Sequence, residues 1–475
     1  MNIKILIEKN LFLSKIAVLQ DEEWTSYYLD SHLEKDLQNQ VVVGEIKQVV
    51  KHLNGVFVDF NDDRNGLLHI KQIPKVYQDK LYPGSRMPVQ IIKQNSGEKG
   101  NKLTGMVNLS GRFLVCLPFE KGIHLSKKIN NEEKRRQIIS AIEEVCGQQY
   151  GFIVRTHAKD VPIARLQQDA LELMKIVQTF MKTKDCLSKG TVLYKEPPLA
   201  VQVILEYLDS GEPLEVICND EAYLKELKAW IGDYEETKKI SYIHFSNHDN
   251  MFHIYDLQKK VDELLHRKIW LKNGGNLMID YTEAMSVIDV NSAKAVLSKK
   301  PQKAVLDLNI LAVRESILQI LRRNLSGIIL IDLVEMTADQ DRQSVYEYAK
   351  AYIASLKDTR TKIYPLTELG LMQISRTKRY KSLHQQLLER CPQCHAPYGE
   401  HTFIYCMQEI EYKIRDLSYH TDHRCVILQV NTRIYEKLQK EHLVEALEEK
   451  YGISLDLQKL DQNSKSMFLC QLYKR

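Results

Sequence analysis

The stretch VIDVNSAKAV, residues 287–296, starts as a β-strand that carries two polar side chains on a single face. Its valine and isoleucine residues favour extended backbone. Residues two apart in a strand point to the same side, so the side chains of Asp289 and Asn291 share one face. An acid and an amide side by side on an apolar strand predict either a local cap or part of a functional site.

A second apolar strand with an acid near its end lies in SGIILIDLVEM, residues 326–336. Between the two strands, apolar residues recur at helical spacing from Leu308 to Leu321. The sequence GGNLMIDYTEAMSVIDVN, residues 274–291, predicts a hairpin that leads into the first strand. Two acid-bearing strands joined through a helix predict an α/β unit. Sheets of this type bind ligands at the carboxyl ends of their strands, where Asp332 lies.

The two acids suggest metal-dependent chemistry. Two carboxylates brought close together, Asp289 and Asp332, repel each other unless a cation lies between them. Mg²⁺ takes few protein carboxylates, keeps waters and binds phosphate oxygens, so it could orient a water for hydrolysis of a phosphodiester. Asn291 could donate a hydrogen bond to Asp289 or to the scissile phosphate. The alternative is that each aspartate caps the following helix or turn.

The composition is that of a globular protein with several domains. The chain has 475 residues, of which 44% are hydrophobic and 27% charged. No apolar run reaches the length of a bilayer span, and the N-terminus has no secretory signal pattern, so we expect no membrane segment. Nine scattered cysteines favour a reducing cytoplasm over a disulfide framework. The net charge of +4 says little, but basic clusters at residues 93–102 and 375–381 indicate nucleic-acid contacts or solvated faces.

A small antiparallel barrel is expected over residues 36–110, after two N-terminal strands. Short apolar strands alternate there with glycines and polar turns, and two further strands are predicted at residues 87–94 and 102–109. This pattern resembles an S1-type OB domain, which binds single-stranded RNA. Phe57 and His69 are expected on its RNA face. The alternative places Phe57 in the core, because its neighbours alternate with it.

Strands and helices alternate downstream of the barrel. We expect strands at residues 112–118 and within 151–160, a helix from Leu166 to Phe180, and strands and helices over 200–275 with Asn219 or Asp220 as a helix cap.

Cys391 and Cys394 form a CPQC motif after a helix expected over residues 381–390. Two thiolates at this spacing hold one zinc ion, and a full site needs four ligands. The remaining ligands could come from the same chain, as His395, His401 and Cys406. Alternatively, two chains could donate two cysteines each. A redox pair fits less well, because it should follow a strand, and a pair of unused thiols is the last alternative.

Seven segments occur in the order in which the ribonuclease E/G family carries them: GVFVDF, GRFLVCLP, GFIVRTHA, MSVIDVNSAKA, GIILIDLVEMT, LGLMQISRTKR and CPQC. The chain therefore resembles this family over nearly its whole length, and is similar to its short, ribonuclease G-like members. The resemblance implies a multidomain α/β fold with six parts. These are an RNase H-like subdomain (1–35 and 200–275), an inserted S1 (OB) domain (36–110), a 5′-sensor region (111–199), a DNase I-like catalytic subdomain (276–387), a zinc link (388–402) and a small C-terminal domain (403–475).

The resemblance also implies roles for the motifs. Asp289 and Asp332 would hold the catalytic Mg²⁺, while Asn291 would support Asp289 and contact the phosphate. Hydrolysis of single-stranded RNA would leave a 5′-phosphate and a 3′-hydroxyl. Cys391 and Cys394 would form a zinc link that shares one Zn²⁺ between two protomers.

Further residues match RNA-contacting positions of the family. In the S1 domain these are Phe57, Leu67 and Lys99. The pocket for an RNA 5′-monophosphate would comprise Gly111, Val115, Arg155, Thr156 and Lys362. The guanidinium fork of Arg155 suits a phosphate. Leu67 stands where the family usually has phenylalanine, and Lys362 where it has an arginine, with Arg360 as a competing match.

The expected function is an Mg²⁺-dependent endoribonuclease that acts in rRNA maturation and mRNA decay. It would be cytoplasmic, form a homodimer or tetramer, and respond to an RNA 5′-monophosphate. Two other classes remain open at this point: a non-catalytic S1-type RNA-binding factor, in which both acids are structural, and a DNA nuclease. Internal cleavage of an RNA oligonucleotide, compared with DNA of the same sequence, separates the three.

Overall fold

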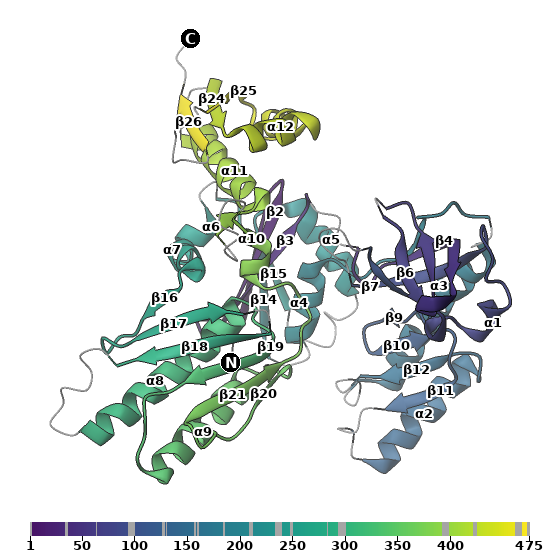
Figure 1. Ribbon diagram of the computed structural model, residues 1–475, viewed down its shortest axis with the longest axis horizontal. Coiled ribbons are helices and arrows are strands. Elements are labelled where there is room, and N and C mark those ends of the chain that lie inside the picture. Colours follow the sequence, from purple (N-terminus) through teal and green to yellow (C-terminus); the bar gives the residue numbers. More distant parts are fainter. Residues whose placement is uncertain are drawn as a thin grey trace. The chain divides into compact units, whose positions relative to one another are not determined.

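The computed structural model describes residues 2–33, 37–62, 64–93, 100–125, 129, 131–155, 158, 161–183, 186–208, 212–232, 240–247, 250–282, 284–292, 301–391, 399–420, 425–460 and 468–472. The chain forms two compact units (Figure 1). The first unit comprises residues 1–34 and 199–475, and the second unit comprises residues 35–198. The first unit is thus discontinuous in sequence, with the second unit inserted into it.

A five-stranded sheet joins the two sequence segments of the first unit. Its strands, in spatial order, are β15 (Ile240–His244), β14 (Leu214–Cys218), β1 (Ile3–Lys9), β2 (Leu13–Gln20) and β3 (Glu23–Ser31). β1 pairs with β2 in antiparallel and with β14 in parallel orientation. The expected alternation of helices and strands follows, with α4 (Leu199–Leu208) and α5 (Glu221–Ile231). Asp220 caps α5, as predicted, because its side chain accepts a hydrogen bond from the Tyr223 amide at 2.8 Å.

The second sheet of the first unit carries both acid-bearing strands. Its six strands, in spatial order, are β16 (Lys268–Trp270), β17 (Asn276–Tyr281), β18 (Met285–Asn291), β19 (Gly327–Asp332), β21 (Leu371–Arg376) and β20 (Thr361–Ile363). β17 and β18 form the predicted hairpin, and β18 runs parallel to β19. The connection between them is α8 (Pro301–Arg322), so the predicted α/β unit is present.

Two helices cover one face of this second sheet (Figure 1). α8 and α9 (Asp339–Ser355) share an apolar core with alternate residues of the strands, among them Ile288 and Ile331. Asp289 and Asp332, the next residue in each strand, are exposed and point the other way. The packing of the helices therefore directs both acids to the open face of the sheet.

The C-terminal part of the first unit begins with short elements. They are α6 (Met251–Ile254), α7 (Gln258–Asp262), α10 (Leu383–Leu387), β22 (Leu388–Glu389) and β23 (Glu400–His401). The prediction of a helix over residues 381–390 is wrong after Leu387, where α10 ends. The chain becomes extended after Leu387 because Leu388 and Glu389 pair with His401 and Glu400.

A small α/β layer ends the chain. Its elements are α11 (Phe403–His420), β24 (Cys425–Val430), α12 (Thr432–Lys440), α13 (Leu443–Tyr451), β25 (Ser454–Lys459) and β26 (Phe468–Leu472). Its strand order is β25-β24-β26, and its core takes in Phe12 from the loop between β1 and β2. In the described part of the chain, no helix combines the length and hydropathy that a membrane span requires.

The second unit contains the predicted barrel. Its five strands are β4 (Val41–Val50), β5 (Gly55–Asp59), β6 (Gly66–His69), β8 (Lys102–Thr104) and β7 (Arg86–Lys93), closed by pairing of β4 with β7. The short helix α1 (Lys75–Gln78) lies between β6 and β7, and β13 (Val192–Tyr194) extends the barrel beside β4. The single strand expected at residues 102–109 is interrupted, because the amides of Gly105 and Met106 donate to the Gln72 carbonyl instead of continuing the ladder.

A smaller sheet completes the second unit. Its strands are β11 (Gly122–Leu125), β12 (Gly151–Val154), β10 (Leu114–Leu117) and β9 (Leu109–Ser110), accompanied by α2 (Glu132–Cys146) and α3 (Ile163–Thr183). α3 contains the apolar stripe predicted from Leu166 to Phe180, and both ends of that stripe are buried.

His384 makes the stability of the first unit depend on pH. It is buried on α10, and its ring stacks on Tyr281 of β17 with 3.8 Å between ring centroids. Burial, together with the charges of Arg323 and Lys378, lowers the pKa of His384 to about 4. An unfolded chain protonates this imidazole below about pH 6.5, whereas the folded chain does so only near pH 4. Stability is therefore lost as the pH falls through this interval.

We expect this histidine to remove about 2–3 kcal/mol of stability between pH 6.5 and pH 4. Tryptophan fluorescence during urea unfolding measures this, because all three tryptophans, at positions 24, 230 and 270, lie in the first unit. The His384→Gln variant should show a shallower pH dependence than the wild type. Parallel curves for the two proteins would contradict the prediction.

Candidate active site

Asp289 and Asp332 lie directly opposite each other on neighbouring parallel strands. They are register partners in the β18–β19 ladder, and each is exposed. Adjacent strands are about 5 Å apart, so the two carboxylates project side by side from one face. Asp332 is the last residue of β19 and Asp289 is two residues from the end of β18, which is the carboxyl end where α/β sheets bind ligands.

Asn291 is turned toward Asp289. Its Nδ2 donates a hydrogen bond to Asp289 Oδ2 at 2.7 Å, which restrains the rotamer of the carboxylate. The alternative of helix capping does not hold for Asp332, because α9 begins at Asp339 with Ala338 at its cap position. The polar residues in VIDVN are therefore arranged as a pair facing a second acid.

The turn between β16 and β17 lies at the same end of the sheet. Asn276 at the start of β17 pairs with Asn291, so the preceding turn is adjacent to the site. Gly274 has φ of +87°, a conformation that favours glycine. A Cβ at Gly275 would lie 2.8 Å from Leu308 and 3.0 Å from the Asn291 carbonyl. These two glycines let the turn close against the strand that carries Asp289.

The carboxylate pair suits a hard divalent cation. Mg²⁺ is usually held by one or two carboxylates, with waters and substrate phosphates as its other ligands. Asp289 and Asp332 provide this donor set on an open face that a nucleic acid could reach. Over the described ranges there is no cluster of three or more His, Cys, Asp or Glu side chains suited to a metal.

The barrel of the second unit has an outward row of side chains that suits RNA. Phe57 of β5 points away from the core, since Val56 and Val58 on either side are fully buried. Its partner in the ladder is Leu67 of β6, and the partner of Leu67 is Lys102 of β8. His69 is exposed on the same face as Leu67. Lys99, the third predicted RNA contact, lies outside the described residues.

Lys102 was not singled out from the sequence. It is exposed and completes a row with an aromatic, an apolar and a basic side chain, the combination that stacks bases and holds phosphates. Its position in the basic cluster at residues 93–102 is visible in the sequence, but its alignment with Phe57 follows only from the strand register.

Three of the predicted 5′-sensor residues lie around β10 and β12. Gly111 precedes β10, Val115 lies within it, and Arg155 follows β12. The backbone amide of Arg155 donates to the Phe113 carbonyl at 3.0 Å. Because β10 and β12 are antiparallel, Gly111 and Arg155 lie at the same end of this sheet. Thr156 lies outside the described residues.

Asp169 of α3 holds the loop before β10. Its carboxylate accepts hydrogen bonds from the amides of Arg112, Phe113 and Leu114 at 3.1, 2.8 and 2.9 Å. Burial raises the pKa of Asp169, and these three donors act against that shift. A Cβ at Gly111 would lie 2.5 Å from the same carboxylate, so glycine is required there. Sequence reasoning missed Asp169, because it lies within an ordinary helical pattern.

Comparison with known proteins decides the family. A model of the ribonuclease E/G family matches residues 108–379, more than half of the chain. The chain belongs to the ribonuclease E/G family. A model of the S1 RNA-binding domain matches residues 35–104, which contain the barrel. The predicted resemblance is confirmed, and so is the prediction that the chain is an endoribonuclease with an S1 domain.

Individual relatives cover most of the chain. Ribonuclease G of Salmonella typhimurium is 27% identical over 415 residues, which are 83% of this chain and 84% of that protein. Ribonuclease G of Haemophilus influenzae is 25% identical over 81% of both chains. Ribonuclease E of Synechocystis is 26% identical over 366 residues, which are 74% of this chain and 54% of that protein.

In this member of the ribonuclease E/G family, Arg360 and Lys362 have different surroundings. Lys362 is exposed on β20, and its Nζ lies 4.8 Å from the centre of the Tyr364 ring. Its ladder partner is Ser375, which places it on the open face of the sheet that carries the acids. Lys362 belongs to the first unit, whereas the other sensor residues belong to the second.

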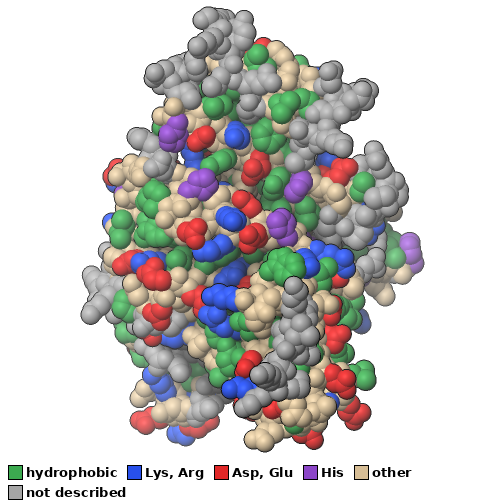
Figure 2. All heavy atoms as spheres, turned by 90° about the vertical axis from the view of Figure 1, so that its left-hand side faces the viewer, with side chains coloured by type: hydrophobic (Ala, Val, Ile, Leu, Met, Phe, Trp, Pro, Cys, Tyr) green, Lys and Arg blue, Asp and Glu red, His purple; other side chains and the backbone are tan. Residues whose placement is uncertain are grey.

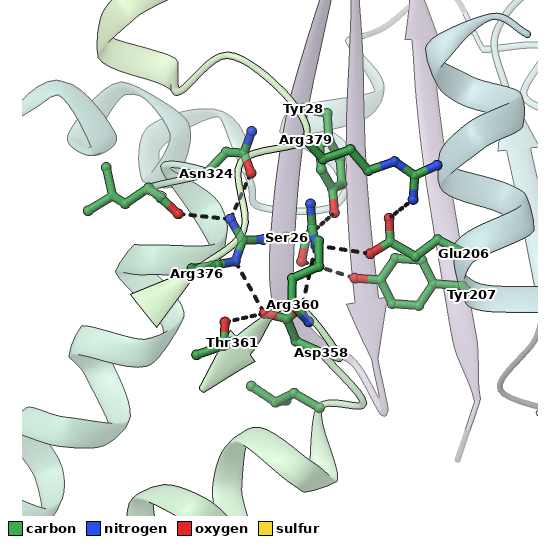
Figure 3. Close-up of polar contacts among 12 residues, drawn as sticks. Ser26, Tyr28, Glu206, Tyr207, Asn324, Asp358, Arg360, Thr361, Arg376 and Arg379 are labelled. Atoms are coloured by element: carbon green, nitrogen blue, oxygen red, sulfur yellow. Dashed lines mark hydrogen bonds and ion pairs between the residues drawn. The ribbon is translucent and has the colours of Figure 1, made fainter. Parts of the chain in front are cut away.

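Arg360 is part of a buried ionic network in the first unit (Figure 3). Its Nε lies 3.3 Å from Glu206 and 3.4 Å from Asp358, and Asp358 also pairs with Arg376 at 3.2 Å. Burial acts to raise the pKa of Asp358, but Arg376 and Arg360 outweigh it and hold the pKa below its ordinary value. These contacts engage Arg360 inside the protein, so of the two matches Lys362 has the exposure that phosphate binding requires.

The cysteine motif lies beyond a two-stranded ribbon. β22 and β23 bring Glu389 opposite Glu400, and Cys391 is half-buried with its Sγ 3.8 Å from Glu400. Cys394 and His395 lie outside the described residues. Cys406 lies on α11 with its side chain in the apolar core of the C-terminal layer, and burial raises its pKa to about 11. Cys406 is therefore enclosed by apolar side chains, whereas Cys391 is half-buried.

His401, another predicted zinc ligand, packs against an aromatic side chain. Its ring stacks on Tyr405 with 3.9 Å between ring centroids, and burial lowers its pKa. A neutral imidazole is the form that binds zinc, so His401 keeps this capacity.

Proposed function

We propose that this endoribonuclease hydrolyses single-stranded RNA with Mg²⁺ held by Asp289 and Asp332. The observation that carries the proposal is the parallel register that sets the two carboxylates opposite each other on an exposed face, with Asn291 bonded to one of them. When bound, Mg²⁺ would supply a polarised water and a positive charge beside the scissile phosphate. The products would carry a 5′-phosphate and a 3′-hydroxyl.

The chain's own residues would position the substrate. The Asn291 amide fixes one oxygen of Asp289, which leaves the other oxygen for the cation or its waters. The rigid β18–β19 ladder keeps the spacing between the carboxylates constant during the reaction. In the second unit, Phe57 and Leu67 would contact bases, and Lys99 and Lys102 would contact phosphates.

The architecture would correspond to that of the family. The five-stranded sheet would be the RNase H-like subdomain, and the six-stranded sheet the DNase I-like catalytic subdomain. Cys391 and Cys394 would form a zinc link between two protomers, giving a dimer that could pair into a tetramer. The enzyme would act in the cytoplasm, on rRNA precursors and mRNA.

The 5′-sensor would consist of Gly111, Val115, Arg155 and Thr156 in the second unit. A 5′-monophosphate would bind to the Arg155 guanidinium, at the end of the sheet where Asp169 holds the loop before β10. This proposal rests on the position of Gly111 and Arg155 at one end of the β10–β12 pair.

We expect Asp169→Ala to remove the preference for 5′-monophosphorylated RNA, because three loop amides lose their charged acceptor. The ratio of cleavage rates on 5′-monophosphate and 5′-hydroxyl RNA should fall toward one, while cleavage of 5′-hydroxyl RNA stays unchanged. Hydrogen exchange of the amides at residues 112–114 should become roughly ten-fold faster or more. Asp169→Asn, which keeps an acceptor oxygen, serves as the matched variant. Faster exchange with an unchanged ratio would contradict the assigned sensor.

The proposed function is tested with single-stranded RNA oligonucleotides that carry a 5′-monophosphate or a 5′-triphosphate. Internal cuts are expected with Mg²⁺ and none in excess chelator, with faster cleavage of the 5′-monophosphate form. Binding without cleavage in Mg²⁺ would identify a non-catalytic RNA-binding factor instead. Cleavage of DNA of the same sequence at an equal rate would favour a DNA nuclease.

A further inference from the structure

An exposed tryptophan and a lysine lie beside each other on β16, at the edge of the sheet that carries Asp289 and Asp332. The Trp270 side chain is 65% exposed, and the Nζ of Lys268 lies 3.9 Å from the centre of the Trp270 ring. Ile269 between them packs against the core beneath the sheet. Because alternate residues of a strand face opposite sides, Lys268 and Trp270 both point to the open face.

The strand register places this pair in line with the two acids and the amide. Lys268 is the ladder partner of Met278, and Met278 is the partner of Asp289. Trp270 is the partner of Asn276, and Asn276 is the partner of Asn291. Two strand spacings amount to about 10 Å, so the pair lies within reach of a nucleotide close to the cleaved bond.

The chemistry of the pair suits single-stranded RNA. An aromatic ring stacks on any base, and an adjacent ammonium group attracts the phosphate that follows. The surface of the first unit seen in Figure 2 is mixed, with Lys and Arg side chains gathered near its middle and acidic side chains around them. The basic side chains in this view do not form one continuous strip along which RNA could bind. A stacking contact would therefore help to position the RNA strand.

We propose that Trp270 and Lys268 form a nucleotide subsite on the catalytic sheet, in which Trp270 stacks on a base and Lys268 binds a neighbouring phosphate. The subsite would position the RNA strand over Asp289 and Asp332. It belongs to the first unit and is separate from the RNA face of the S1 domain. The inference rests on the proposed function, because it takes the site of Asp289 and Asp332 as the place of cleavage.

Tryptophan fluorescence tests the contact without any cleavage. The second unit contains no tryptophan, so quenching by RNA reports on the first unit alone. In excess chelator, an RNA oligonucleotide should quench the full-length protein, and the Trp270→Phe variant should lose most of that signal. Trp270→Ala should bind the oligonucleotide roughly ten-fold more weakly, the size expected for one lost base stack. Trp230→Ala, an exposed tryptophan on α5, should bind like the wild type.

A base scan locates the subsite. Substrates with one abasic nucleotide at each position around the cleavage site are compared for the wild type and Trp270→Ala. At one position, the abasic nucleotide should slow cleavage by the wild type but should not slow cleavage by Trp270→Ala any further. Lys268→Gln should reduce the slope of log affinity against log salt by about 0.7, the value for one single-strand phosphate. Lys228→Gln is the control. Lys228 also lies over an aromatic ring, 4.9 Å from the centre of Tyr242, but Tyr242 belongs to the five-stranded sheet.

The outcomes separate this inference from the proposed function. A wild-type protein that never cuts RNA overturns the proposed function. A protein that cuts RNA, but whose Trp270→Ala variant shows the same abasic profile and quenching as the wild type, overturns only the subsite. A Trp270→Ala variant with altered oligomeric state and unchanged RNA affinity would also overturn it, because Trp270 would then contact a second copy.

Discussion

The Asp332→Asn variant is expected to lose RNA cleavage by roughly a thousand-fold or more while it still binds RNA. The substitution replaces a carboxylate with a neutral amide in the pair that would hold Mg²⁺, and metal-ion catalysis contributes several kcal/mol to transition-state stabilisation. Asp289→Asn should behave in the same way, because the two residues are register partners. Binding of RNA to the S1 face in the second unit should be unaffected.

The fold should survive this substitution. Two carboxylates side by side repel each other in the absence of a cation, so removing one charge does not destabilise the metal-free protein. Mg²⁺ should raise the melting temperature of the wild type, because a cation that binds only the folded state stabilises it. The variant should lack this increase. Asp339→Asn, an exposed acid at the start of α9, should retain both cleavage and stabilisation by Mg²⁺. Full cleavage by either site variant would overturn the proposed metal pair.

The Asp358→Ala variant is expected to destabilise the first unit by about 3–5 kcal/mol, because it leaves a buried ion pair without one partner. Asp358 is the acceptor for Arg360, Arg376 and the Thr361 hydroxyl (Figure 3). Arg360 Nη1 and Arg376 Nη2 are already buried without a hydrogen-bond partner in the described structure. Without the carboxylate, the buried Arg376 would lose its ion-pair partner, while Arg360 would still pair with Glu206.

Urea unfolding followed by tryptophan fluorescence measures this loss in the first unit. Asp280→Ala is the comparison, because Asp280 pairs with Arg267 at 2.6 Å where both side chains are exposed. Exposed pairs contribute about 0.2–1 kcal/mol, so this variant should change the stability little. Equal effects of the two substitutions would show that burial of the network does not matter. The Asp358 network also connects β20 and β21 to β3 through Arg360 and Tyr28.

Local patterns in the sequence were sufficient to predict the two strands that carry Asp289 and Asp332. In VIDVN and IILID the alternation of apolar and polar residues has a period of two, and the helix between them has a period near 3.6. Such periods depend only on neighbouring residues. They therefore predicted β18, α8, β19 and the position of Asp289 and Asp332 at strand ends.

Other predictions depended on contacts far along the chain. The helix expected over residues 381–390 ends at Leu387, because pairing with residues 400 and 401 competes with helix formation. Arg360 and Lys362 look alike in the sequence, but only Arg360 meets Glu206 and Asp358 in the folded protein. Asp169 gains its role from three amides more than fifty residues away.

The sequence by itself determined the family, the S1 barrel and the two strands that end in acids, because these follow from short motifs and local periodicity. Only the tertiary structure decided that Asp289 and Asp332 are register partners, that Asn291 turns toward the first of them, and that Lys268 and Trp270 lie on the same face. Register is a property of two strands together. It is set by the helices packed against the sheet, which bury one residue of every two and so direct the remaining side chains to the open face.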